Sequence, residues 1–159
     1  MSSSLHPPVR TLMGPGPADV SPRVLAALVR PIIGHLDPLF VSLMDDVKRL
    51  LQYAFQTSNE LAIPLSAPGS TGMEAACVNL LECGDNVIVC QNGVFAGRMK
   101  ENVERYGATT IVVIDCWGDP ADPDKLPAAI KAHPDAKVVA FVHAETSTGV
   151  CYCSGELGV

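Results

Sequence analysis

The feature that most constrains the fold is an alternation of short apolar runs with segments of helical character. Four apolar runs are predicted to be strands: residues 61–65, 86–90, 109–114 and 136–142. Helix formers at helical spacing separate each run from the next. Strands that alternate with helices favour a largely parallel sheet with helices on its faces. The predicted fold class is therefore α/β.

The boundaries of the helices can also be predicted. Helices are expected over residues 24–29, 39–55, 73–81, 98–106 and 125–133. Ser21 and Pro22 suit the start of the first one, because Pro is tolerated where the helical amides have no partner. Gly84 and Gly107 follow two of the helices and are expected to end them, Gly84 as a left-handed C-cap. The apolar stripe of 39–55 is expected to pack in a core.

The stretch Ser66–Glu74 suggests an anion site between the first strand and the next helix. Thr71 and Glu74 have the spacing of a capping box, in which the two side chains satisfy free amides of the first turn. Free amides and the helix dipole favour a phosphate at a helix start, and glycine allows close approach. We therefore expect a phosphate-bearing ligand at Gly69–Thr71; the alternative is a plain turn without a ligand. Neither the triphosphate loop nor the dinucleotide fingerprint is present.

Three segments follow predicted strands and are expected to share one edge of the sheet. They are residues 68–71, 92–95 and 145–149, and parallel sheets bind ligands at the carboxyl ends of their strands. The aromatic ring of Phe95 could stack on a flat heterocycle. Polar groups of residues 145–147 could bond to its substituents. A phosphate and a substituted flat ring describe pyridoxal phosphate, flavin mononucleotide or a nucleotide, and composition does not choose among them.

Composition and charge indicate a globular chain that does not bind nucleic acid. Of the 159 residues, 48% are hydrophobic and 18% are charged, enough apolar material for a core. The net charge is −6 and the isoelectric point is about 5.0, whereas a phosphate backbone attracts basic surfaces. No apolar run is long enough to span a bilayer, and the N-terminus lacks the pattern of a secretory signal. We expect no nucleic acid or membrane partner and a cytoplasmic location.

The six cysteines do not form a metal-binding pattern. No Cys-x-x-Cys pair is present, and no histidine lies at zinc-finger spacing from a cysteine. Cys77 and Cys90 lie within apolar patterns, where a free cysteine behaves as a small hydrophobe. We expect buried, reduced thiols and no metal site.

Four segments together resemble the class V aminotransferases. They are residues 14–17 (Gly-Pro-Gly-Pro), 66–75, 92–95 (Asn-Gly-Val-Phe) and 143–149 (His-Ala-Glu-Thr-Ser-Thr-Gly). Each motif is weak alone, but their order and spacing are specific, and the resemblance covers about residues 10–150. Within the class, the chain is most similar to the alanine–glyoxylate and serine–glyoxylate (serine–pyruvate) aminotransferases.

The resemblance implies the large domain of a fold-type I enzyme, with pyridoxal 5'-phosphate as cofactor and a homodimer as the usual assembly. It implies transamination between a small amino acid, alanine or serine, and the 2-oxo acid glyoxylate or pyruvate. Residues 1–20 would form an arm with the Gly-Pro loop, 21–150 part of the cofactor-binding domain and 151–159 a divergent tail. Relatives occur in peroxisomes or mitochondria, but residues 156–159 are no peroxisomal signal.

The resemblance also implies roles for individual residues. Gly69, Ser70 and Thr71 would hold the phosphate. Phe95 would stack on the pyridine ring, and Thr146 would contact its phenolic oxygen. Gly16 would lie beside the substrate. At Ala67-Pro68 the chain departs from the family, where Gly followed by Ser or Thr is more usual, and Pro68 has no N–H to give to a phosphate.

A second departure concerns the catalytic residues. In relatives, an aspartate for the pyridine nitrogen, the Schiff-base lysine and a substrate-binding arginine follow the segment that resembles 143–149, and none has a counterpart here. The lysines of this chain are predicted to lie away from the site: Lys48, Lys100, Lys125, Lys131 and Lys137. We therefore assign no catalytic residue. We expect a chain that is truncated before the lysine, by truncation or a frameshift, and is inactive alone.

Two other functions stay open. One is a related lyase or cysteine desulfurase, although desulfurases carry His in the segment where this chain has Phe95. The other, from a different class, is a non-catalytic domain or fragment that binds a phosphate-bearing ligand.

Overall fold

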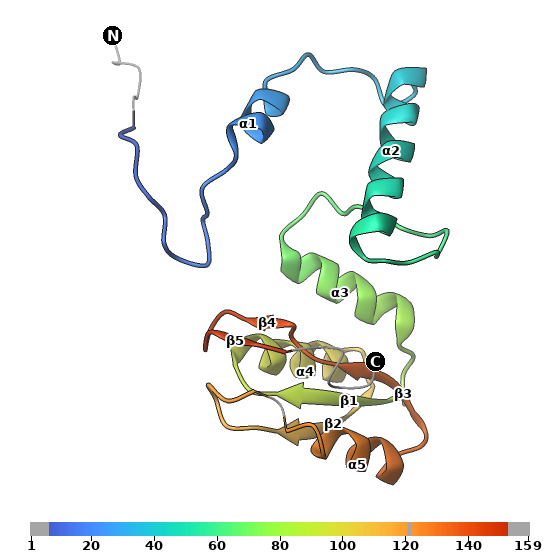
Figure 1. The fold of residues 1–159 in the computed structure, drawn as a ribbon. Coiled ribbons are helices and arrows are strands. Elements are labelled where there is room, and N and C mark those ends of the chain that lie inside the picture. Colours follow the sequence, from blue (N-terminus) through green and yellow to red (C-terminus); the bar gives the residue numbers. More distant parts are fainter. Residues whose placement is uncertain (1–6, 121, 153–159) are drawn as a thin grey trace. The chain divides into compact units, whose positions relative to one another are not determined.

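The chain divides into two compact units, Met1–Pro64 and Leu65–Val159, in a computed structural model that describes residues 7–120 and 122–152 (Figure 1). The first unit contains α1 (Pro22–Leu28) and α2 (Pro38–Ala54), so both helices predicted there are confirmed. Asp37 caps α2 by accepting a hydrogen bond from the Leu39 amide at 2.8 Å. None of the helices in the described residues has the length and hydropathy that crossing a bilayer requires.

The apolar stripe of α2 does not form a core in the structure. No residue of α2 is buried among the described residues, and Leu39 and Leu50 are both exposed. The expectation that this stripe packs inside a core is therefore wrong for the chain as it stands. The amphipathic pattern predicted the helix correctly, because the pattern depends on the period and not on what covers the face.

Two predictions about the Ser66–Glu74 stretch are also wrong. Residues 61–65 do not form a strand, since Pro64 offers no amide for a ladder. The helix after them, α3 (Gly69–Leu80), begins four residues earlier than predicted, with Pro68 as its N-cap and no side-chain cap. Thr71 therefore lies inside the first turn, and no capping box forms. Glu74 instead accepts a hydrogen bond from the Tyr106 hydroxyl at 3.2 Å.

A three-stranded parallel sheet lies at the centre of the second unit. Its strands are β1 (Asn86–Gln91), β2 (Thr109–Ile114) and β3 (Ala136–Ala140), in the order β2-β1-β3. Ile88 of β1 lies opposite Ile111 on one side and Val139 on the other. The predicted α/β class is confirmed.

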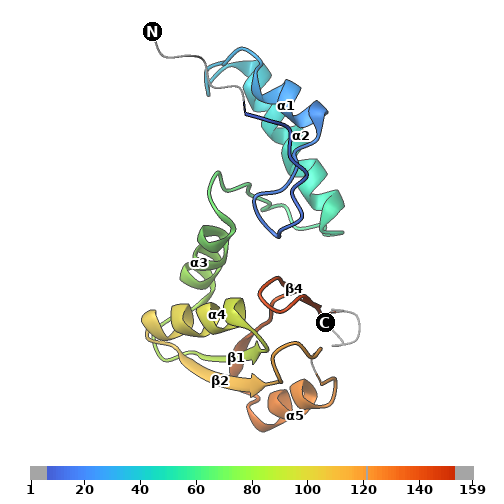
Figure 2. The ribbon, with the colours of Figure 1, turned by 90° about the vertical axis from the view of Figure 1, so that its left-hand side faces the viewer.

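Helices cover both faces of this sheet. α4 (Val94–Arg105) connects β1 to β2, and α5 (Lys125–Ala132) connects β2 to β3. The second connection runs back across the sheet, and the two helices lie on opposite faces (Figures 1 and 2). α4 starts four residues before the predicted position, directly after Gly93.

The core forms on both faces of β1. Val87 and Val89 pack with Val103 of α4 on one face, and Ile88 and Cys90 pack with Leu126 of α5 on the other. Successive side chains of a strand point to opposite faces, so an unbroken apolar run suits a strand that is covered twice. These four residues, 87–90, are at most 1% exposed.

The turns that precede β1 and β2 contain glycines in the left-handed region. The helix α4 stops before Gly107, as predicted, and this glycine has φ +78°. Gly84 has φ +91°, but it does not cap α3, whose C-cap is Leu81. Instead, the Gly84 amide donates to the Gly107 carbonyl at 2.9 Å and joins the two turns.

A short hairpin that was not predicted follows β3. It consists of β4 (Ala144–Glu145) and β5 (Val150–Cys151), which pair antiparallel. The predicted fourth strand, 136–142, ends earlier, at Ala140. The turn of the hairpin ends at Gly149, whose φ of +81° suits glycine.

The cysteines differ in burial, contrary to the expectation of uniformly buried thiols. Cys90 is buried and Cys77 is half-buried, whereas Cys83, Cys116 and Cys151 are exposed and all five are free. Burial of the Cys90 thiol, with a smaller contribution from nearby Asp115, raises its pKa to about 11. Cys153 lies outside the described residues.

The raised pKa of Cys90 predicts a loss of stability at high pH. The unfolded chain releases this proton near the ordinary thiol pKa of about 8.5, but the folded chain keeps it up to about pH 11. The free energy of unfolding should therefore fall as pH rises between these values. Urea unfolding of the wild type and of Cys90→Ala measures this, with a shallower decline in the variant. Parallel declines would contradict the assignment.

Candidate functional site

A hollow of about 370 Å³ lies in the second unit, between α3, α4 and the hairpin. We call it the α3–α4 hollow. Its lining residues come from segments far apart in sequence: Gly69, Ser70, Met73, Phe95, Met99, Val142, Ala144 and Thr146. The volume is within the usual range for small-molecule sites, which starts at about 300 Å³. The wall is largely apolar, with a few polar groups.

The hollow brings together most of the residues that were predicted to hold a cofactor. Gly69 and Ser70 are the first residues of α3, Phe95 is in the first turn of α4, and Thr146 follows β4. Thr71 does not line the hollow, and its amide donates to the Pro68 carbonyl at 2.9 Å. Gly16 belongs to the first unit and is not among the lining residues.

The beginning of α3 has amides without partners. Within the described residues, the amides of Gly69 and Ser70 donate no hydrogen bond to another part of the chain. A Cβ at Gly69 would have no neighbour within 4 Å, so the space in front of this turn is open. Unpaired amides at a helix start attract an anion, because they carry the positive end of the helix dipole. The two residues that carry these amides both line the hollow.

The beginning of α4 is occupied by a carboxylate of the chain itself. Glu145 Oε2 accepts from the amides of Phe95 at 3.0 Å and Ala96 at 3.2 Å. Glu145 Oε1 accepts from the amide of Ser147 at 3.2 Å and from its hydroxyl at 2.5 Å. The Ser147 Oγ in turn accepts from the Val94 amide at 3.1 Å. All three amides at this helix start are therefore satisfied by the hairpin.

This network corrects the sequence interpretation of Glu145 and Ser147. Their polar groups were expected to bond to substituents of a bound ring, but neither residue lines the hollow. Glu145 is fully buried, and both of its carboxylate oxygens bond to the chain. No local signal could show this, because Glu145 and Phe95 are separated by 50 positions in sequence.

Gly93 provides the space for the buried carboxylate. A Cβ at this position would lie 2.4 Å from Glu145 Cγ and 2.5 Å from its Cδ, closer than real contacts allow. The φ of Gly93 is −176°, an extended value that any residue adopts. Glycine is therefore required here by space and not by backbone conformation.

Phe95 carries a cation on its ring. The guanidinium carbon of Arg98 lies 5.1 Å from the ring centroid, within the range of a cation–π contact. Arg98 is exposed and does not line the hollow. Arg98 thus contacts the Phe95 ring without being part of the wall of the hollow.

No lysine lines the α3–α4 hollow. Lys100 pairs with Glu104 at 2.7 Å, and Lys137 pairs with Asp85 at 2.8 Å. Lys125 departs from the sequence interpretation, because its ammonium reaches the carboxyl end of β2. There it bonds to Asp115 Oδ1 at 2.7 Å and to the Ile114 carbonyl at 3.0 Å. Asp115 thus holds Lys125 and raises its pKa by hydrogen bonding.

The apolar side of the hollow was missed from the sequence. Met73, Met99, Val142 and Ala144 line it beside the polar residues. Met73 and Met99 lie on the helical faces of α3 and α4, which a periodic pattern assigns to packing. The pattern cannot separate a residue in a core from one in the wall of a ligand site.

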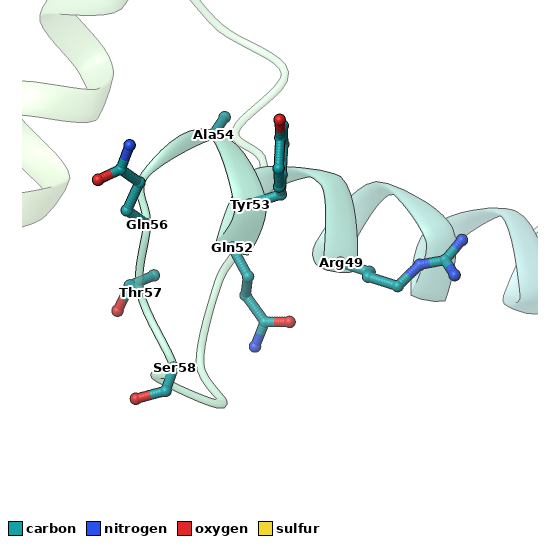
Figure 3. Close-up of a pocket in the computed structure, with 7 residues that line it drawn as sticks. All are labelled: Arg49, Gln52, Tyr53, Ala54, Gln56, Thr57 and Ser58. Atoms are coloured by element: carbon teal, nitrogen blue, oxygen red, sulfur yellow. The ribbon is translucent and has the colours of Figure 1, made fainter.

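A second hollow of about 560 Å³ lies in the first unit, at the end of α2. Figure 3 shows that its polar side chains do not converge: those of Arg49, Tyr53 and Gln56 point in different directions. The side chain of Gln52 already has a partner within the chain, since its Nε2 donates to the Asn59 carbonyl at 2.7 Å. This hollow therefore lacks the arrangement of a binding site.

Comparison with known proteins shows which enzymes the chain resembles. No protein-family model matches the chain. The (S)-ureidoglycine–glyoxylate transaminase of Bacillus subtilis is 39% identical over 143 residues, which is 89% of this chain and 34% of that protein. The alanine–glyoxylate aminotransferase of Drosophila melanogaster is 39% identical over 146 residues, 92% of this chain and 37% of that protein. The crystal structure of alanine–glyoxylate aminotransferase from Nostoc sp. matches with a TM-score of 0.90 and 40% identity, over 99% of this chain and 42% of that one.

The chain is similar to glyoxylate aminotransferases over about nine tenths of its own length. The resemblance seen in the four sequence motifs is confirmed, and the fold is that of part of the α/β domain of these aminotransferases. The chain spans about a third of the length of the curated relatives that it matches.

The steric role of Gly93 predicts the effect of adding one methyl group at this position. Gly93→Ala should destabilise the fold by about 1–3 kcal/mol, because the buried Glu145 must move and its hydrogen bonds distort. Urea unfolding gives the free energy. The matched control is Gly97→Ala, also in α4, where a Cβ would only touch Gln91 Nε2 at 3.6 Å. That change should be neutral or stabilising by about 0.5–1 kcal/mol. Equal effects would contradict the steric argument.

Proposed function

We propose that this chain forms the part of an aminotransferase that holds pyridoxal 5'-phosphate, in an enzyme that acts on alanine or serine and on glyoxylate or pyruvate. The names of the relatives support this choice: they are transaminases that use glyoxylate. They also favour transamination over the lyase and desulfurase alternatives. The proposal includes the cofactor-binding domain over residues 21–150 and the homodimer that the family suggests.

The observation that carries the proposal is the contrast between two helix starts. α4 begins against Glu145, so its amides are neutralised by the chain itself. α3 begins at the hollow with the amides of Gly69 and Ser70 free among the described residues. An anionic ligand group would therefore bind at α3. The cofactor suits this lining, because it combines a phosphate, which the helix start would hold, with a flat ring, which Phe95 would contact.

Each wall of the hollow has a distinct task in this proposal. The amides of Gly69 and Ser70, with the Ser70 hydroxyl, hold the phosphate. Phe95 would stack on the pyridine ring, and the Thr146 hydroxyl would bond to the phenolic oxygen. Met73 and Met99 exclude water from the ring. When bound, the cofactor supplies an electron sink for the bonds at the α-carbon of an amino acid.

Pro68 and Thr71 reduce the number of phosphate donors. Pro68 has no amide hydrogen, and the Thr71 amide already donates to Pro68. The phosphate therefore has two backbone donors and one hydroxyl. We propose that Thr71 has no direct contact with it, which revises the assignment from the sequence, and that Gly16 stays a candidate for the substrate side.

The lining of the hollow offers no amine. Transamination needs an amine that holds the cofactor and moves a proton between the substrate and cofactor carbons. The residues that line the hollow provide donors and an aromatic wall, but no such group. We propose that the 159-residue chain binds the cofactor without turning over substrate, and detectable transamination by the purified chain would contradict this.

The binding test uses pyridoxamine 5'-phosphate, which has no aldehyde to react with surface lysines. Saturable binding is followed by calorimetry and by the fluorescence of Trp117, the single tryptophan. Gly69→Leu should weaken binding at least about tenfold, because the side chain fills the open space before the free amides. The matched control is Gly72→Leu on the same helix, where the added side chain also meets no neighbour and does not line the hollow.

Pyridoxamine without phosphate separates the contributions of the two ends of the ligand. It should bind far more weakly than the phosphorylated form, because the helix start acts on the phosphate. A folded chain that binds neither compound would refute the proposal. Binding of inorganic phosphate with the same affinity as the whole ligand would favour the alternative, a domain that recognises phosphate alone.

A further inference from the structure

We propose that Glu145 is a positioning residue of this site, whose buried carboxylate fixes the two walls that carry Phe95 and Thr146. The inference rests on the proposed function, since it concerns the same hollow. It assigns to Glu145 no contact with ligand, because the residue does not line the hollow and both of its carboxylate oxygens bond to the chain.

The hairpin places Glu145 between two lining residues. Ala144 and Thr146 face the hollow, and Glu145 lies between them in sequence. Glu145 is the last residue of β4 and Thr146 begins the turn, and the side chain of Glu145 does not line the hollow. That side chain reaches the start of α4, where it is fully buried. Thr146 is thus attached to α4 through its neighbour.

The other end of the network fixes Phe95. The Phe95 amide donates to Glu145 Oε2, while the ring of the same residue lines the hollow. Ser147 adds a second connection, because its hydroxyl joins Glu145 Oε1 to the Val94 amide. One carboxylate therefore sets the position of the aromatic wall relative to the hydroxyl of Thr146. Figure 2 shows β4 beside the start of α4, where this network lies.

If Glu145 only stabilised the fold, its loss would weaken ligand binding only by lowering the fraction of folded chains. A positioning role makes a different prediction: chains that are folded and loaded should still hold the ligand in a changed orientation. The circular dichroism that a bound ring acquires from its surroundings measures this, when it is expressed per bound ligand. Preorganisation of this kind depends on the groups behind the binding residues.

Glu145→Gln keeps the shape of the side chain and replaces one acceptor oxygen by an NH₂ group, which cannot accept from the amides. Ser147→Ala is the second variant. It removes the bridge to Val94 at an exposed position, where the fold should tolerate the change. Thr148→Ala is the matched control: its hydroxyl donates to the Glu145 carbonyl at 3.4 Å within the hairpin, and α4 is not involved.

The experiment titrates each chain with pyridoxamine 5'-phosphate, after far-ultraviolet circular dichroism has confirmed a fully folded population. Glu145→Gln should bind about tenfold more weakly, and Ser147→Ala should change in the same direction. At saturation, the dichroism of the ligand band per bound ligand should be lost or altered in both variants. Thr148→Ala should retain the wild-type affinity and band.

The outcomes separate this inference from the proposed function. If the wild type binds and both variants keep its affinity and its band, Glu145 has no positioning role and the inference fails alone. If Thr148→Ala changes as much as the others, the effect belongs to the hairpin in general, and the inference fails too. If the folded wild type does not bind, the proposed function fails, and the inference that rests on it falls with it. Should Glu145→Gln not fold, Ser147→Ala decides.

Discussion

The parallel pairing of β1 with strands on both sides is the constraint on which the second unit depends. A strand with two parallel neighbours needs connections that cross the sheet, and here these are α4 on one face and α5 on the other. Both faces of β1 are then covered, which its unbroken apolar run allows. The same geometry brings the segments that follow β1 and β3 to one end of the sheet, so residues 95 and 146 meet although they are far apart in sequence.

The helix starts at this end are used in opposite ways. Both have amides that need acceptors, and burying either without a partner would cost free energy. The chain satisfies α4 with Glu145, at the cost of requiring glycine at position 93. It leaves α3 open at the hollow, with Pro68 as an N-cap that has no side-chain acceptor. Of these two helix starts, only that of α3 therefore has free amides that can bind an anion.

The sequence predicted what depends on period and on local turns. The three strands of the sheet, the five helices of the described residues and the stop of α4 at Gly107 follow from such signals. The capping box at Thr71 failed because Pro68 already begins the helix, and a motif of two residues cannot show where the first turn starts. The role of Glu145 could not be predicted, because it depends on contacts across some 50 positions. The hairpin was missed because each of its strands has only two residues, too few for a periodic pattern. Likewise, the sequence placed Gly69, Ser70, Phe95 and Thr146 near one another only through the expected sheet, and not through any signal of their own.

Holding a ligand and reacting with it make different demands on a site, and the hollow meets the first. Donors at a helix start, an aromatic ring and a hydroxyl bind and orient a phosphorylated ring without any change in their own protonation. A reaction at that ring needs a group that exchanges protons. The ammonium of Lys125 reaches the carboxyl end of β2, but it is engaged by Asp115. This pairing raises the pKa of Lys125, which keeps its amine protonated and therefore non-nucleophilic. The residues of the hollow therefore account for recognition of the cofactor and for its orientation, and the chemistry requires an amine that these residues do not supply.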